Sequence, residues 1–146
     1  CSSDLNRSML MLEQTFFIIK PDALERGLVG EILSRIENKG LKITKLELVK
    51  LNANKLKAHY NHIVNESFYP ELEEYMTKGN SIIGILTGDN AISTWRKMMG
   101  ATNPREADLG SIRGDFGFVT SNGVMKNLVH GSDSVKSATN EINIWF

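Results

Sequence analysis

The sequence predicts one domain in which strands alternate with helices, with two helices between the second and third strands. Residues 15–20 form an unbroken run of β-branched and aromatic side chains, which is typical of a strand buried on both faces. Several later segments repeat apolar residues at helical spacing between glycines and prolines. With 146 residues, 41% of them hydrophobic, the chain is long enough for one core. Alternation normally favours a parallel sheet, but this pattern alone leaves the strand directions open.

The first half of the chain supplies two strands and a helix. Pro21 ends the first strand, and a helix is expected from Val29, because the apolar side chains that follow share one helical face. Gly40 supplies the C-cap of this helix. Residues 41–51 are rich in Leu, Ile and Val between charged residues, which indicates a second strand with a phase slip near residues 44–45.

The middle of the chain supplies the other expected helices and the third strand. In order, these are a helix at 54–63, a helix from Pro70 to Gly79, a strand at 81–87 and a helix from Asp89 or Asn90 to Gly100. Residues 101–126 then form a long irregular tract with several glycines. Loops of this length inside compact domains are typically functional.

The last strand and helix surround a histidine. Residues 127–134 run from a short apolar strand into His130, a glycine turn and a helix start, and each of residues 132–134 is a favourable N-cap. The free N–H groups of a helix start favour an anion, so the imidazole is a candidate nucleophile for a phosphoryl group. Glu141 follows nine residues after Ser132, so the two can meet only if the chain bends back. Taken alone, a histidine at a strand end is more often structural.

Several distinctive motifs also follow one another along the chain. The sequence His-Gly-Ser-Asp-Ser at 130–134, preceded by Asn127, resembles the active-site signature of nucleoside diphosphate kinases. Further motifs agree with that family in order, at residues 20–22, 26–32, 59–60, 68–70, 102–104, 112–116 and 145–146. The resemblance runs from about residue 15 to the end of the chain. It implies an α+β fold with a ferredoxin-like βαββαβ core, in which a four-stranded antiparallel sheet is flanked by helices.

The resemblance implies a ping-pong nucleoside diphosphate kinase. His130 would take the γ-phosphoryl group of a nucleoside triphosphate as a pros-phosphohistidine and give it to a diphosphate. The nucleophile must be the neutral imidazole, whose ordinary pKa of ~6.5 leaves most of it competent at neutral pH. Glu141 and Ser132 match the residues that orient the ring and fix its tautomer, and Lys20 and Tyr60 match further catalytic positions.

The nucleotide-binding positions of the family are carried over in the same way. They correspond here to Lys20, Tyr60, Phe68, Leu72, Arg96, Thr102, Arg113 and Asn127. Arg96, Thr102 and Arg113 would hold the phosphates with Tyr60 near them, and arginine suits bidentate phosphate contact. Lys20 and Asn127 would bond the ribose hydroxyls and the phosphate side.

Phe68 would stack on the base and Leu72 would line the same cleft. Stacking without base-edge hydrogen bonds does not distinguish bases, which suits ATP, GTP, GDP and deoxynucleoside diphosphates alike. From the residues alone, Phe68 is more simply explained as a core residue, and Arg96 and Arg113 as ordinary solvent-exposed arginines. His59 and His62 are interpreted as structural or surface residues.

Mg²⁺ is the expected cofactor, carried on the nucleotide phosphates rather than by the protein, since Asp115 and Asp133 are isolated in the sequence. Between Asp115 and Asn127 the chain is about four residues longer than is typical, and residues 120–123 look like a hairpin turn. We hypothesise that this turn extends one wall of the cleft and changes base or sugar preference. The loop around Pro104 resembles one that builds trimer contacts, so a homo-oligomer is expected, a hexamer rather than a tetramer.

Other classes of protein fit less well. An idle nucleotide-binding scaffold would normally lack the nucleophile or an arginine, and neither is lost here. A serine hydrolase using Ser132 or Ser134 with His130 is disfavoured, because adjacent residues on a strand–helix turn rarely align for that chemistry and no G-x-S-x-G elbow is present. No P-loop motif occurs. Seventeen basic and seventeen acidic residues give zero net charge, which disfavours a nucleic-acid binder.

The chain is expected to form one domain with no membrane anchor. No apolar run approaches the roughly 18 residues of a membrane span. A single cysteine, Cys1, is compatible with a reducing compartment, so a cytoplasmic location is expected. Residues 1–8 are expected to be a disordered or cloning-derived N-terminal segment, and residues 9–146 a single nucleoside diphosphate kinase domain.

Overall fold

The computed structural model describes residues 12–146, so the expectation for residues 1–8 lies outside the described part of the chain. The elements are, in order, β1 (Leu12–Ile19), α2 (Pro21–Glu25), α3 (Val29–Lys39), β2 (Lys42–Lys50), α4 (Ala53–His59), the 3₁₀ turn η1 (Asn61–Ile63), α5 (Tyr69–Lys78), β3 (Asn80–Asp89), α6 (Ala91–Met99), α7 (Ile112–Phe116), β4 (Phe118–Val119), β5 (Met125–Lys126), β6 (Val129–Gly131) and α8 (Val135–Trp145).

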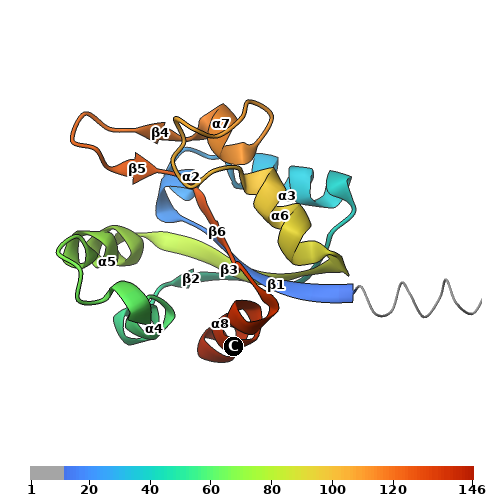
Figure 1. Ribbon diagram of the computed structural model, residues 1–146, viewed down its shortest axis with the longest axis horizontal. Helices are drawn as coiled ribbons and strands as arrows, with labels where there is room; N and C mark the ends of the chain where they lie inside the picture. The colour runs from blue at the N-terminus through green and yellow to red at the C-terminus, as the bar shows by residue number, and fades with distance from the viewer. Residues whose placement is uncertain (1–11) are drawn as a thin grey trace, which may run out of the picture.

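A four-stranded sheet in the order β2-β3-β1-β6 forms the centre of the domain. Every pair of neighbouring strands is antiparallel. The strand directions that the alternating pattern left open are therefore those of the expected ferredoxin-like α+β fold. Figure 1 shows α2, α3, α6 and α7 on one side of the sheet and α4 and α8 on the other, with α5 at the end of the sheet next to α4.

Strand β1 is buried on both faces, as its unbroken apolar run predicts. Phe16 and Ile18 belong to the core under α4, α5 and α8, whereas Phe17 and Ile19 belong to the core under α3 and α6. All four side chains are fully buried. Burying a side chain of this size contributes about 1.5–3 kcal/mol, so β1 is an anchor for both layers. Its neighbour β6, which carries His130, is thereby attached to a rigid support.

The local signals in the sequence are partly confirmed. The register of β2 shifts between Ile43 and Lys45, which confirms the phase slip. Gly40 adopts φ 95° as the C-cap of α3. The helix expected at 54–63 instead ends at His59 and continues as the separate 3₁₀ turn η1, and helix α2 follows Pro21, which takes the first helical position rather than only ending the strand.

Residues 101–126 contain more regular structure than expected. They include the short helix α7 and a β4–β5 hairpin, whose turn is closed by a 2.9 Å hydrogen bond from Thr120 N–H to the Val124 carbonyl. Gly123 in this turn has φ 82°, a conformation that favours glycine. The predicted hairpin turn is therefore present.

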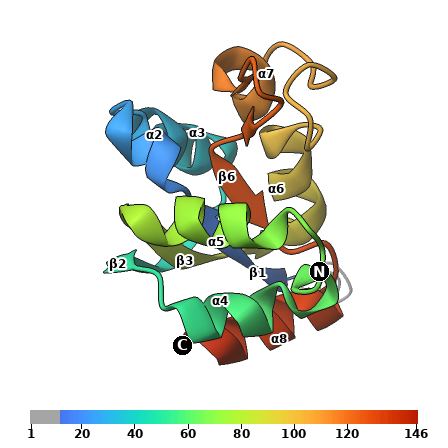
Figure 2. The same ribbon diagram turned by 90° about the vertical axis from the view of Figure 1, so that its left-hand side faces the viewer.

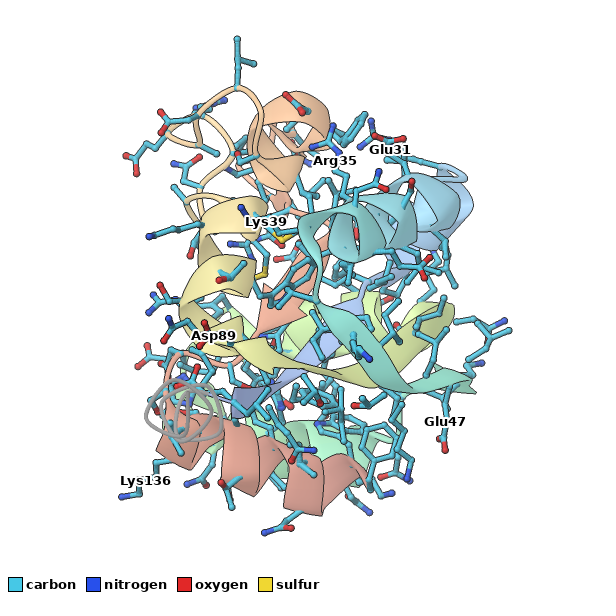
Figure 3. The ribbon with its side chains drawn as sticks, turned by 90° about the vertical axis from the view of Figure 1, so that its right-hand side faces the viewer. Glu31, Arg35, Lys39, Glu47, Asp89 and Lys136 are labelled. Carbon is cyan, nitrogen blue, oxygen red and sulfur yellow. The ribbon has the colours of Figure 1, made fainter. Side chains whose placement is uncertain are left out.

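An ion-pair cluster attaches this tract to α3. Arg35 on α3 bonds Glu31 at 3.0 Å, and both side chains are labelled in Figure 3. Arg35 also reaches Asp115 on α7 at 2.8 Å. The carboxylate of Asp115 also accepts the Gly110 N–H at 2.8 Å. Asp115 thus holds α7, which carries Arg113, against α3. Within residues 12–146, no helix is long and apolar enough to cross a membrane.

Candidate active site

A cavity of about 1360 Å³ opens beside His130 between α4, α6, α8 and the loop that precedes α7. Figure 2 shows α4 and α8 running side by side at one edge of the molecule, with α6 on the other side of β6. Most of the predicted site residues line this cavity: Lys20, Tyr60, Arg96, Thr102, Arg113, Asn127, His130 and Glu141. They come from segments spread over most of the chain, and the fold gathers them at one place.

Glu141 fixes the orientation of the histidine ring. His130 Nε2 lies 3.1 Å from Glu141 Oε1, and the same oxygen accepts the Ser132 hydroxyl at 2.7 Å. Ser132 is fully buried and also accepts the Phe16 N–H at 3.2 Å, so it joins α8 to β1. The chain therefore does bend back after Ser132, where Ser134 caps α8 by accepting the Ser137 N–H. A carboxylate can only accept, so the His130 proton lies on Nε2 and Nδ1 keeps its lone pair.

The backbone of His130 is held as firmly as its ring. The indole N–H of Trp95 donates to the His130 carbonyl at 3.2 Å. A Cβ at the next residue, Gly131, would approach Trp95 Nε1 to 2.6 Å and Met99 Cε to 2.7 Å. Glycine is therefore required here for close packing of β6 against α6.

Arg113 is buried among carbonyl oxygens. It donates to the carbonyls of Asn127 (3.2 Å), Gly100 (3.0 Å) and Val129 (2.7 Å). These three bonds leave two of the five guanidinium N–H groups for a ligand. Burial, with a smaller contribution from Arg96, lowers the pKa of Arg113 to about 10, so the group stays charged at neutral pH.

Lys20 and Asn127 form a hydrogen-bonded pair beside Arg113. Lys20 Nζ donates to Asn127 Oδ1 at 2.7 Å, and Asn127 Nδ2 donates to the Thr102 carbonyl at 3.1 Å. Burial first, and then Arg113, lowers the pKa of Lys20 to about 8. A second positive group is thus held beside Arg113 with little solvent to screen it.

The turn after Asn127 is strained. Val129 N–H bonds the Asn127 carbonyl at 2.7 Å, which makes a three-residue turn centred on Leu128, and Leu128 has φ 70°. Such a conformation costs about 1–3 kcal/mol for a residue other than glycine, and it persists only where the surroundings impose it. Here Leu128 is fully buried and its carbonyl accepts the Lys20 N–H at 2.8 Å. The turn places Asn127 on one side and His130, three residues after Asn127, on β6.

His59 lies inside the site, which the sequence did not indicate. Its side chain is 1% exposed, and its ring centre is 4.5 Å from that of His130. Trp145 Nε1 donates to His59 Nδ1 at 3.0 Å, and His59 Nε2 lies 3.8 Å from Glu141 Oε2. Burial, with a smaller contribution from the neighbouring His130, lowers the pKa of His59 to about 2, so the ring is neutral. The interpretation of His59 as a structural or surface residue was therefore incomplete.

His59, His130 and Glu141 place potential metal-ligand atoms within 4.8 Å of one another. Their hydrogen bonds argue against a metal site, however. Trp145 occupies Nδ1 of His59 and Glu141 occupies Nε2 of His130, so the nitrogens that face the carboxylate both carry protons. The cluster is better described as a hydrogen-bond network around Glu141.

Residues 13–146 match the family model described as nucleoside diphosphate kinase. The chain belongs to this family. A nucleoside diphosphate kinase of Streptococcus agalactiae is 53% identical over 136 residues, which cover 92% of this chain and 99% of that protein. A nucleoside diphosphate kinase of Streptococcus pneumoniae is 52% identical over 137 residues, with 92% and 100% covered.

Solved structures of nucleoside diphosphate kinases share the fold. The apo enzyme of Encephalitozoon cuniculi is 40% identical with a TM-score of 0.84, and the match covers 92% of this chain and 88% of that one. The enzyme of Borrelia burgdorferi, solved as a transition-state mimic with vanadate and ADP, is 32% identical with a TM-score of 0.86 and covers 94% and 88%. The membership inferred from the motifs and the ferredoxin-like fold are thus both confirmed.

Three predicted site residues of this nucleoside diphosphate kinase lie outside the cavity lining. Ser132 is buried behind it and acts on Glu141. Phe68 precedes α5 and is half exposed, and Leu72 packs partly against the core under α5. The turn of the β4–β5 hairpin also does not line the cavity. Base stacking by Phe68 and a cleft wall formed by the hairpin therefore stay predictions.

Proposed function

We propose that Nδ1 of His130 carries the phosphoryl group during the nucleoside diphosphate kinase reaction. The observation that supports this assignment is the 3.1 Å contact between His130 Nε2 and Glu141, which leaves Nδ1 as the nitrogen with a free lone pair. The lone pair attacks the γ-phosphorus, the bond to the β–γ bridging oxygen breaks, and the diphosphate leaves. A terminal oxygen of the second diphosphate then attacks the phosphohistidine and restores the ring.

Glu141 supports both half-reactions in this proposal. As the N–P bond forms, the ring gains positive charge, and the Nε2 proton remains on the histidine, where the carboxylate stabilises it. Ser132 holds the same carboxylate oxygen at 2.7 Å, so the carboxylate need not reorganise during the reaction.

We expect the phosphates to bind where the positively charged side chains line the cavity. Arg96 and Arg113 would neutralise the charge of the transferred group, Lys20 and Asn127 would contact the ribose and the phosphates, and Thr102 lies beside them. Burial raises the pKa of Tyr60 above its ordinary range, so its hydroxyl stays protonated and can donate. Because several cations meet in a low-dielectric site, each is more effective than in water.

Mg²⁺ would enter on the nucleotide. The carboxylates that line the cavity, Glu13, Asp108, Asp133 and Glu141, come from four separate parts of the chain, and the described residues offer no cage of oxygen ligands. A metal held by phosphate oxygens and water fits such a site. It would neutralise phosphate charge, while the side chains named above bind and orient the nucleotide.

The base is proposed to stack on Phe68 beyond the cavity, with Leu72 beneath it. The β4–β5 hairpin contacts α5, the helix that Phe68 precedes and that contains Leu72, because Lys126 Nζ lies 4.3 Å from the ring centre of Tyr75 on α5. We therefore keep the hypothesis that the extra turn at 120–123 affects base or sugar preference, acting through α5. Equal relative rates for all nucleotides in a variant with a shortened turn would show that the turn is inert.

A homo-oligomer is proposed, with a hexamer favoured over a tetramer. Strand β2 lies at the edge of the sheet, and its Leu46 and Leu48 side chains are 45% and 65% exposed. An unpaired, partly apolar edge of this kind is usually covered in a native protein. Light scattering after size-exclusion chromatography gives the number of subunits directly.

The single cysteine is the basis for proposing a cytoplasmic location.

The nitrogen assignment can be tested by ³¹P NMR of the protein after reaction with MgATP. Phosphorus on Nδ1 and on Nε2 of histidine gives distinct resonances, and we expect the Nδ1 form. A resonance of the Nε2 form would overturn the assignment of roles to Glu141 and Ser132 while leaving the kinase activity intact.

A further inference from the structure

The indole of Trp145 sets the tautomer of His59. An indole N–H can only donate, so Nδ1 of His59, 3.0 Å away, must accept. The ring is neutral because it is buried, and a neutral ring has a single proton. That proton therefore lies on Nε2.

The proton on His59 Nε2 faces the second oxygen of Glu141. The distance from Nε2 to Oε2 is 3.8 Å, too long for a hydrogen bond but short enough for an N–H dipole to attract a carboxylate. The first oxygen, Oε1, is already shared by Ser132 and His130. In the opposite tautomer, a nitrogen lone pair of His59 would face Oε2 and repel it.

We infer that Trp145 and His59 are positioning residues that hold the Glu141 carboxylate in the orientation that keeps the His130 proton on Nε2. If the carboxylate turned away, the His130 proton could move to Nδ1, and the nucleophile would be blocked. The inference rests on the proposed role of His130. It assigns a function to a buried histidine and a buried indole, each of which would otherwise only fill the core.

The test uses Trp145→Phe, which keeps an aromatic ring in place. Trp145 stacks on Phe16 with an interplanar angle of 5°, so a phenyl ring preserves part of this packing while it removes the N–H donor together with one ring of the indole. The chain has three histidines, so ¹⁵N-labelled imidazoles give a simple NMR spectrum in which one-bond and two-bond couplings report each tautomer. Thr139→Val is the matched control, because it removes a 3.1 Å hydrogen bond on the exposed side of the same helix.

In the unmodified protein, His59 and His130 are both expected as Nε2–H tautomers. In Trp145→Phe, His59 should populate both tautomers and His130 should gain the Nδ1–H form. The rate of His130 phosphorylation by MgATP should fall on the order of tenfold, by analogy with the loss of an outer hydrogen-bond partner of a metal-binding histidine. ADP affinity should not change, because neither residue is proposed to bind the nucleotide.

A second pair of variants separates positioning from stability. His59→Gln keeps an N–H that can face Glu141, whereas His59→Leu does not, and glutamine should retain the greater share of the phosphorylation rate at equal thermal stability. An Nδ1–H tautomer of His59 in the unmodified protein, or an unchanged rate in Trp145→Phe, would overturn the inference. Absence of phosphorylation on His130 in the unmodified protein would instead refute the proposed function, so the two failures are distinct.

Discussion

Replacing Glu141 with glutamine removes the charge of the carboxylate while keeping its shape. Oε1 of Glu141 accepts hydrogen bonds from His130 at 3.1 Å and from Ser132 at 2.7 Å. If the amide carbonyl takes this position, both bonds survive but lose the charge on the acceptor, and the amide N–H₂ is turned toward His59 Nε2–H. If the amide is reversed, its N–H₂ faces Nε2 of His130 and drives the His130 proton to Nδ1.

The size of the effect follows from the bond to His130. A hydrogen bond to a charged acceptor is worth about 1.5–3 kcal/mol and a neutral one about 0.5–1.5, so the loss is about 1–2 kcal/mol. The Ser132 bond is equally weakened before and during the reaction, so it does not affect the rate. Because the ring gains charge in the transition state, the loss from the His130 bond slows phosphorylation by about 5- to 30-fold.

The assay is a single-turnover measurement of phosphoenzyme formation from MgATP, with ADP affinity measured separately. Glu37→Gln, on the exposed end of α3, is the matched control and should leave the rate unchanged. A Glu141→Gln enzyme that phosphorylates as fast as the control, or one that loses only nucleotide affinity, would refute the role given to this carboxylate.

Three further changes have definite expected outcomes. Gly131→Ala should lower the free energy of unfolding by about 1–3 kcal/mol in urea titrations, because the new methyl group meets the Trp95 ring; a stability equal to that of the unmodified protein would contradict the close packing. With the pKa of Lys20 lowered to about 8, its ammonium is lost as the pH rises through 8, so the KM for nucleotide should rise above pH 8, and Lys20→Arg should flatten this rise. Between pH 8 and the ordinary value of 10.5, the unfolded chain binds the proton that folded Lys20 lacks, so this group makes the free energy of unfolding rise with pH. Tyr75→Phe removes the hydroxyl that donates to buried Asp22 and should cost about 1–3 kcal/mol in thermal unfolding; an unchanged melting temperature would show that Asp22 finds another partner.

Sequence patterns predicted the positions of helices and strands better than they predicted which strands pair with one another. The burial of residues 15–20 on both faces and the register slip of β2 follow from side-chain periodicity, and both are present. Periodicity reports which side chains are buried, not which strands pair, so it could not distinguish a parallel from an antiparallel sheet. The motifs of the family supplied that information. Helix α2 was missed because Pro21 was interpreted only as the end of a strand.

Within the site, sequence spacing could not predict the contacts between residues that are distant in the sequence or that meet only because the chain turns. Glu141 reaches His130 only because the chain turns at Ser134, and His59 meets Trp145 from 86 residues away. His59 and Trp145 both lie in motifs that match the family, at residues 59–60 and 145–146. No rule of sequence spacing, however, predicts that the end of α4 lies beside α8. Base stacking by Phe68 stays a prediction, because Phe68 does not belong to the lining of the cavity.

The measurement that tests the central claim most directly is the intact mass of the protein after incubation with MgATP, followed by addition of GDP. The account predicts one acid-labile phosphoryl group that disappears when GDP is added and is absent from His130→Ala. An adduct that persists in His130→Ala, or nucleotide binding without any adduct in the unmodified protein, would contradict it.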